Sequence, residues 1–166
     1  MKNIFSTALL LSSLGTVVAA DITIRFQDSA PKDLFTMRTN CPVADMQIVI
    51  DLTQSAGSLI FDVTADGAGV AVFQPVEVQA GAAQTQTVVD GDQKLSLFVD
   101  ALTAGAEIVI SADLDDVLPQ SQLGQTRVTG SELDGTSVTI DFAGMRESAT
   151  FSGGTNEVSF PYGCLS

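Results

Sequence analysis

The sequence contains no histidine and no tryptophan, and it has a single tyrosine among 166 residues. Without histidine, Ser-His-Asp and Cys-His catalysis are excluded, as are nearly all zinc, copper and non-haem iron sites that use imidazole ligands. Paired-carboxylate glycoside hydrolysis is formally possible, but the chain lacks the tryptophan and tyrosine rings on which sugars commonly stack. It also lacks a nucleophile elbow, a P-loop and a dinucleotide fingerprint. We therefore expect a protein that is not an enzyme.

Basic residues are scarce as well: 7 lysines and arginines stand against 20 acidic residues. If Lys2 is removed with the N-terminal segment considered below, 6 basic residues remain against 20 acidic ones, and the net charge becomes −14. Such a chain repels phosphate backbones and anionic lipid surfaces, so we expect no nucleic-acid partner and no membrane insertion. Strong acidity keeps a protein soluble in salt, where the repulsion is screened, and it suits a marine or salt-rich setting.

The first twenty residues, MKNIFSTALLLSSLGTVVAA, have the features of a bacterial secretory signal. A lysine near the start precedes an apolar stretch from Leu9 to Val18, and the segment ends in alanines, which predicts cleavage after Ala20. The apolar stretch is too short to span a bilayer, although an N-terminal anchor helix is the alternative. We expect residues 1–20 to be a signal peptide and residues 21–166 to be one periplasmic or extracellular domain.

Only two cysteines are present, Cys41 and Cys164. An even number of cysteines in an oxidising compartment predicts one disulfide, which would tie the C-terminus to an early segment. Because the closed loop spans most of the domain, the chain-entropy model gives a stabilisation on the order of 4 kcal/mol. Two free thiols or intermolecular pairing are the alternatives.

Apolar residues recur at every second position, which is the period of a β-strand with one buried face. Short turn signals rich in glycine separate these runs, among them Asp90-Gly91 and Asp134-Gly135, a dipeptide typical of hairpins. No segment has a helical stripe of ten residues or more. We predict an all-β fold, a single antiparallel β-sandwich of roughly nine or ten strands. It would be immunoglobulin-like or jelly-roll-like, with a closed barrel as the alternative. The clearest alternating runs cover residues 22–26, 46–52, 95–99, 108–114 and 138–142.

Acidic residues flank two of these runs. If the strands at 95–99 and 107–112 pair as a hairpin, the residues before the first strand meet those after the second. Five carboxylates would then gather at one edge, where without a cation each would have a raised pKa or spread into water, and a bound divalent ion would remove the conflict. Calcium takes oxygen ligands alone, so we predict a calcium site there. The alternatives are ordinary solvated turns and a second site around Asp62 and Asp66. The predicted metal ligands are Asp90, Asp92, Asp113, Asp115 and Asp116.

Four stretches carry a resemblance to a known family: GSLIFDVTADGAGVAVFQPVEV, DGDQKLSLFVDAL, ADLDDV and VTGSELDGTSV. They resemble small secreted proteins of marine alphaproteobacteria identified as "aggregation factor core" proteins, and the likeness covers most of the mature chain. The label is shared with large sponge adhesion proteoglycans, which associate in a calcium-dependent manner. The resemblance implies an extracellular, non-catalytic role and favours the DGD and DLDD segments as shared features of the fold.

Together these features predict a secreted, non-catalytic protein for adhesion or self-association, assisted by calcium. Its partner would be a second copy, another extracellular protein or a polysaccharide. A pilin-like structural fibre subunit is one alternative, supported by the size, the signal and Tyr162 near the C-terminus, but not by the position of Cys164. A periplasmic protein-binding or inhibitor module is another.

Overall fold

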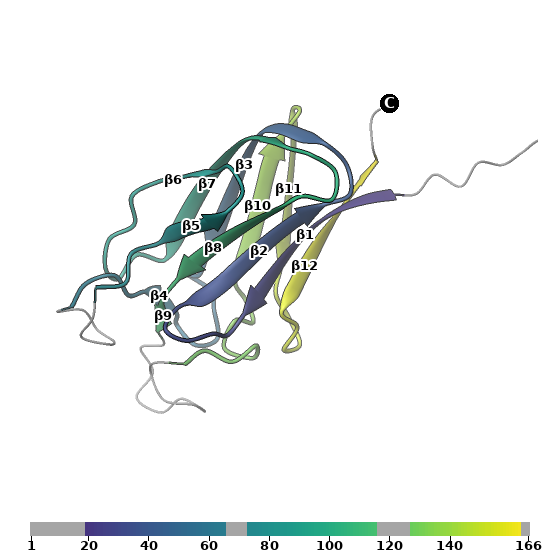
Figure 1. Ribbon diagram of the computed structural model, residues 1–166. Coiled ribbons are helices and arrows are strands. Elements are labelled where there is room, and N and C mark those ends of the chain that lie inside the picture. The colour runs from purple at the N-terminus through teal and green to yellow at the C-terminus, as the bar shows by residue number, and fades with distance from the viewer. Residues whose placement is uncertain (1–18, 66–72, 116–126, 164–166) are drawn as a thin grey trace, which may run out of the picture.

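The alternating apolar residues build two antiparallel sheets that pack face to face, as Figure 1 shows. The computed structural model describes residues 19–65, 73–115 and 127–163. Within these ranges the strands are β1 (Ala19–Gln27), β2 (Asp33–Thr39), β3 (Val43–Asp51), β4 (Ile60–Phe61), β5 (Glu77–Ala80), β6 (Gln84–Thr85), β7 (Lys94–Leu102), β8 (Glu107–Ala112), β9 (Leu114–Asp115), β10 (Ser137–Phe142), β11 (Met145–Thr150) and β12 (Glu157–Gly163).

Sheet A has the strand order β12-β1-β2-β8-β5, and sheet B has the order β11-β10-β3-β7-β6. A third, two-stranded ladder joins β4 to β9. The prediction of an all-β antiparallel sandwich is confirmed. The described ranges contain twelve strands rather than nine or ten, because β4, β6 and β9 are two-residue strands too short to leave an alternating pattern.

The hydrophobic core lies between the inner faces of the two sheets. All five runs predicted from alternation fall on strands: β1, β3, β7, β8 with β9, and β10. Their inward residues are almost fully buried, for example Ile22, Leu95 and Val138, each with 0% exposure. The rings of Phe26 and Phe35 pack 5.3 Å apart on neighbouring strands of sheet A. Burial of these rows is the main favourable contribution to folding.

The hairpin predicted between residues 95–99 and 107–112 is wrong. Strand β7 pairs with β3 and β6 in sheet B, whereas β8 pairs with β2 and β5 in sheet A. The chain passes from sheet B to sheet A between β7 and β8, and the apolar faces of these two strands therefore meet across the core. The connection turns at Thr103, whose carbonyl accepts a hydrogen bond from Ala106 N (3.0 Å), and Gly105 N bonds Thr39 O (2.8 Å).

The two-residue hairpin of this fold connects β10 to β11 instead. Phe142 pairs with Met145, so the loop consists of Ala143 and Gly144. Both residues have positive φ, 51° and 75°, as a type I′ turn requires. The sequence signal was weak because alanine, unlike asparagine or aspartate, is uncommon at a position with positive φ.

The predicted turn at Asp134-Gly135 is present, but it lies in the connection from β9 to β10 rather than in a hairpin. Ala56 N donates to Asp134 O (2.6 Å), and Gly135 N donates to Phe151 O (2.9 Å). Gly135 has a φ of 92°, and a Cβ atom there would lie 2.0 Å from Gln54 O. Both the backbone angle and the close approach of another backbone segment therefore require glycine.

We expect Gly135→Ala to lower the free energy of unfolding by about 3 kcal/mol or more, because the added methyl group clashes with backbone as well as straining φ. Gly91→Ala is the matched control: Gly91 has a φ of 81°, but nothing lies within 4 Å of its added Cβ. The free energy of unfolding of that variant should fall by only about 1 kcal/mol. Urea denaturation of both variants measures the difference, and equal losses would contradict the clash.

The predicted signal peptide falls almost entirely outside the described residues, since β1 begins at Ala19. In the described part of the chain, no helix has the length and hydropathy of a membrane span. Secretion therefore stays a prediction.

The predicted disulfide also stays a prediction, because Cys164 lies outside the described residues. Cys41 is 1% exposed and follows β2, where its N–H donates to Thr39 Oγ1 (3.1 Å). Strands β2 and β12 flank β1 and are both antiparallel to it, so they run in the same direction. Gly163, the last residue of β12, pairs with Ala19, the first residue of β1. Strand β2 runs towards the same end of the sheet, because Thr39 pairs with Ile22. Strands β2 and β12 therefore finish at the same end of sheet A.

If Cys41 and Cys164 are bonded, the denatured protein will show no thiol that reacts with iodoacetamide, as measured from its intact mass. Reduction with dithiothreitol should then lower the free energy of unfolding by on the order of 4 kcal/mol. The Cys164→Ser variant should lose the same amount and become insensitive to dithiothreitol. Alkylation of both cysteines without prior reduction would rule the bond out.

Candidate metal centre

The ladder between β4 and β9 brings three aspartates to one side of the backbone. Ile60 pairs with Asp115 and Phe61 with Leu114, and Asp62 N continues the ladder by donating to Asp113 O (3.1 Å). Asp62 is therefore opposite Asp113. Side chains two residues apart on a strand share a face, so Asp115 lies on the same face as Asp113. Phe61 and Leu114, which alternate with them, are buried in the hydrophobic core.

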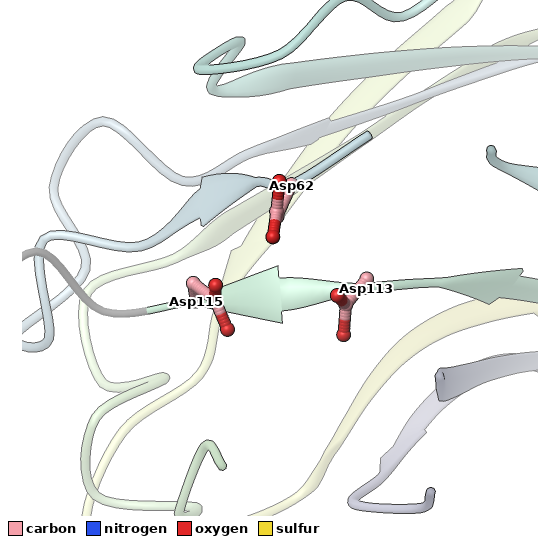
Figure 2. A group of neighbouring side chains, drawn as sticks. All are labelled: Asp62, Asp113 and Asp115. Carbon is pink, nitrogen blue, oxygen red and sulfur yellow. The ribbon is translucent and has the colours of Figure 1, made fainter. Parts of the chain in front are cut away.

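These three residues, Asp62, Asp113 and Asp115, are called here the aspartate triad. One carboxylate oxygen from each lies within 4.8 Å of the others, and no other such group of potential metal ligands occurs in the described ranges. Figure 2 shows Asp62 on the segment that follows β4, facing the strand that carries the other two. The exposed fractions are 1% for Asp62, 5% for Asp113 and 1% for Asp115. Three carboxylates are thus held together away from solvent.

Two of the five predicted ligands, Asp113 and Asp115, belong to the triad. Asp62 belongs to the alternative site predicted around Asp62 and Asp66. The triad therefore combines residues from both predicted sites. Asp116 and Asp66 lie outside the described residues. Although the predicted hairpin is absent, the segment around residue 90 still reaches this end of the sandwich, because it bonds to β4 rather than to β8.

The other two predicted ligands, Asp90 and Asp92, lie beside the triad. Asp90 Oδ1 accepts hydrogen bonds from Val63 N (3.0 Å) and Thr64 N (3.3 Å). The bond from Val63 and one from the Asp62 carboxyl group lower the pKa of Asp90. Asp92 Oδ2 instead accepts from Val89 N (2.9 Å) within its own turn. Asp90 therefore contacts the triad through Asp62, whereas the Asp92 side chain turns back on its own loop.

Burial dominates the electrostatics of this region. Desolvation, together with the negative charge of Asp62, raises the pKa of Asp113 to about 6, against the opposing influence of Lys32. Desolvation, reinforced by the charges of Asp28 and Asp113, also raises the pKa of Asp33 to about 7. Ionised carboxylates at these positions are therefore disfavoured unless a positive charge is close.

Lys32 is a positive charge near the triad, but its ammonium group bonds other residues. Its Nζ donates to Pro75 O (2.9 Å) and to a Glu77 carboxylate oxygen (2.5 Å), and its side chain is 13% exposed. It lowers the pKa of Asp113 through space rather than by a direct bond. Lys32 is therefore held by Pro75 and Glu77 and acts on the triad only at a distance.

Gln74 is a neighbour of the triad that the sequence did not reveal. Its exposed fraction is 7%, and its Nε2 donates to Asp113 Oδ2 (2.7 Å). Its backbone N–H bonds Val63 O (3.1 Å), which fixes the residue beside the segment that carries Asp62. A glutamine 39 positions away from Asp113 in the chain forms no local motif with it, so no sequence pattern would have identified this contact.

A set of carboxylate and amide oxygens, without nitrogen or sulfur ligands, is suited to hard cations such as calcium. Comparison with known proteins gives no further assignment: no protein-family model, curated protein or solved structure matches this chain. The resemblance to aggregation factor core proteins is therefore an untested expectation.

The raised pKa of Asp33 gives the metal-free protein a specific pH dependence. The folded state retains the Asp33 proton up to about pH 7, whereas the unfolded chain releases it near 3.8. The contribution of Asp33 to stability is therefore greatest at low pH and declines as the pH rises through about 7.

In EDTA, we expect the free energy of unfolding of the wild type to fall between pH 4.5 and pH 7.5 by about 3 kcal/mol more than that of Asp33→Asn. Asparagine keeps an oxygen that can accept from Ser29 N, as Asp33 Oδ1 does at 3.1 Å, but it does not ionise. Asp141→Asn, which makes the same substitution on the outer face of β10, is the control. Urea titrations at both pH values measure the difference, and parallel curves for wild type and Asp33→Asn would contradict it.

Proposed function

We propose that the protein is a secreted, non-catalytic β-sandwich domain for extracellular adhesion or self-association, assisted by calcium. The burial of the aspartate triad carries this proposal. Its side chains are at most 5% exposed, so a small ion can be enclosed by them but a substrate cannot contact all three. Oxygen ligands enclosed at one end of a sandwich suit structural stabilisation by a cation rather than turnover.

The outer face of sheet B offers a surface for association. Phe98 on β7 is 49% exposed, and it lies in a row across the sheet with Gln47 on β3 and Asp141 on β10. Phe98 and Asp141 line a shallow hollow that also includes Asp45 and Asp100. An exposed aromatic ring surrounded by carboxylates resembles the anchor and polar rim of a protein interface.

The charge of this face explains why calcium would assist association. Two copies that meet through their Phe98 surfaces would bring six carboxylates together, since each surface contributes Asp45, Asp100 and Asp141. With a net charge of −13 for the full chain, the copies repel one another at low salt. Calcium ions bound by the facing carboxylates would reduce this repulsion and allow the aromatic anchors to pack, whereas magnesium keeps its waters more firmly.

The secretory features of residues 1–20 and the resemblance to aggregation factor core proteins further support an extracellular adhesive role. The predicted Cys41–Cys164 disulfide is consistent with an oxidising compartment. The exposed Phe98 with its surrounding carboxylates suits a second copy of this chain as the partner, with a polysaccharide or another protein as the alternatives.

Sedimentation velocity tests this proposal. We expect the secreted protein to be monomeric in EDTA and to form dimers or larger species in 5 mM calcium, but not in 5 mM magnesium. Phe98→Ser should weaken association about tenfold or more, as the loss of a buried aromatic anchor does. Val89→Ser is the matched control, because Val89 is 58% exposed but lies in a turn away from the hollow. Monomers at every calcium concentration would contradict self-association.

A further inference from the structure

The triad oxygens lie close enough together to share a single ion. Calcium–oxygen distances are about 2.3–2.6 Å, so two ligands on opposite sides of one calcium ion lie about 4.6–5.2 Å apart. The three oxygens of the triad lie within 4.8 Å of one another. The triad oxygens are therefore close enough to bind one calcium ion together. Magnesium usually keeps several waters and is rarely held in a cage of protein ligands, so a buried set of protein oxygens favours calcium.

Gln74 provides the second, independent indication of a ligand. Its Oε1 is buried and has no hydrogen-bond partner, although the other end of the same amide bonds Asp113. A buried oxygen left in this way costs about 1–3 kcal/mol, so native structures rarely leave one without a reason. A half-turn of the amide about its last bond would place Oε1 beside Asp113 Oδ2, where both oxygens could bind one cation.

We infer that the aspartate triad and Gln74 form a binding site for one divalent cation, with calcium as its occupant. Three carboxylates and one amide oxygen supply four protein ligands, all of the hard type that calcium prefers. The ion supplies two of the positive charges that the buried carboxylates need. It also gives the buried Oε1 of Gln74 a partner.

Asp90 supports the site from outside without being a ligand. It accepts from Val63 N and Thr64 N, the two residues that follow Asp62. It also bonds the Asp62 carboxyl group. These contacts hold the chain at the point where Asp62 turns towards the other triad members, so Asp90 is a positioning residue.

This inference rests on the proposed function in one respect, since it names the site at which calcium would stabilise the adhesive domain. The two can fail separately. Calcium binding by a protein that remains monomeric would retain the site and reject self-association through calcium. Association without calcium binding at the triad would retain the adhesive role and overturn the site.

Calorimetric titration of the EDTA-treated, desalted secreted protein with calcium chloride tests the site, together with thermal unfolding in EDTA, 5 mM calcium and 5 mM magnesium. We expect one calcium ion per chain and a rise in the unfolding midpoint of about 5–10 °C in calcium. Magnesium should raise the midpoint by much less. Absence of binding heat and of a midpoint shift in calcium overturns the inference.

Asp115→Asn distinguishes a ligand from a merely structural residue. In EDTA this substitution should leave the midpoint unchanged or raise it, because it removes buried negative charge. In calcium it should abolish most of the rise seen for the wild type. A purely structural aspartate would give the same change in midpoint in both buffers, and that result would exclude Asp115 from the site.

Gln74→Met tests the amide oxygen, because methionine keeps the length of the side chain without a hard ligand. We expect a loss of calcium affinity of about tenfold or more. Gln79→Met is the control: the Gln79 amide bonds Ser111 and Glu77, so its replacement should leave calcium affinity unchanged. Asp92→Asn should also leave affinity unchanged. Loss of binding in Asp92→Asn with retention in Asp115→Asn would instead place the ion at the turn around residue 90.

Discussion

Face-to-face packing of two apolar strand surfaces is the interaction on which the rest of this molecule depends. Each inner row buries aliphatic and phenylalanine side chains, such as Ile108 and Ile110 on β8 and Leu97 on β7. The chain passes from sheet B to sheet A between β7 and β8, so the apolar rows of these two strands meet across the core. This packing also fixes which residues of every strand point away from the core, since the side-chain period is two.

The acidic end of the sandwich follows from the same constraint. Because Leu114 must enter the core, Asp113 and Asp115 must point to the opposite face of the backbone. The register of the β4–β9 ladder then places Asp62 opposite Asp113. The carboxylates thus come together as a consequence of where their apolar neighbours pack. Conflict between local burial and buried charge is characteristic of functional sites rather than of ordinary cores.

Alternation predicted the strands with one apolar and one polar face, and it failed where a strand departs from that pattern. Strand β2 buries polar Asp33 at its start, and β11 (Met145–Thr150) is exposed almost throughout and is held by pairing with β10. Asp113 and Asp115 were predicted as ligands from a hairpin that is absent, and they meet Asp62 through the β4–β9 ladder instead. Gln74 was not predicted, because its contact arises from tertiary packing between segments far apart in the chain.

The way the sheets end has a further consequence for how copies of this domain can meet. Edge strands β11 and β12 contact each other, as do β5 and β6, so the rims of the two sheets close towards one another. An open, flat rim would invite strand addition, in which main-chain hydrogen bonds extend a sheet into an aggregate. Another copy would then contact the outer faces of the sheets, where side chains make the contact. Contacts of that kind respond to ionic conditions and can be reversed, unlike a continuous sheet grown from one chain to the next.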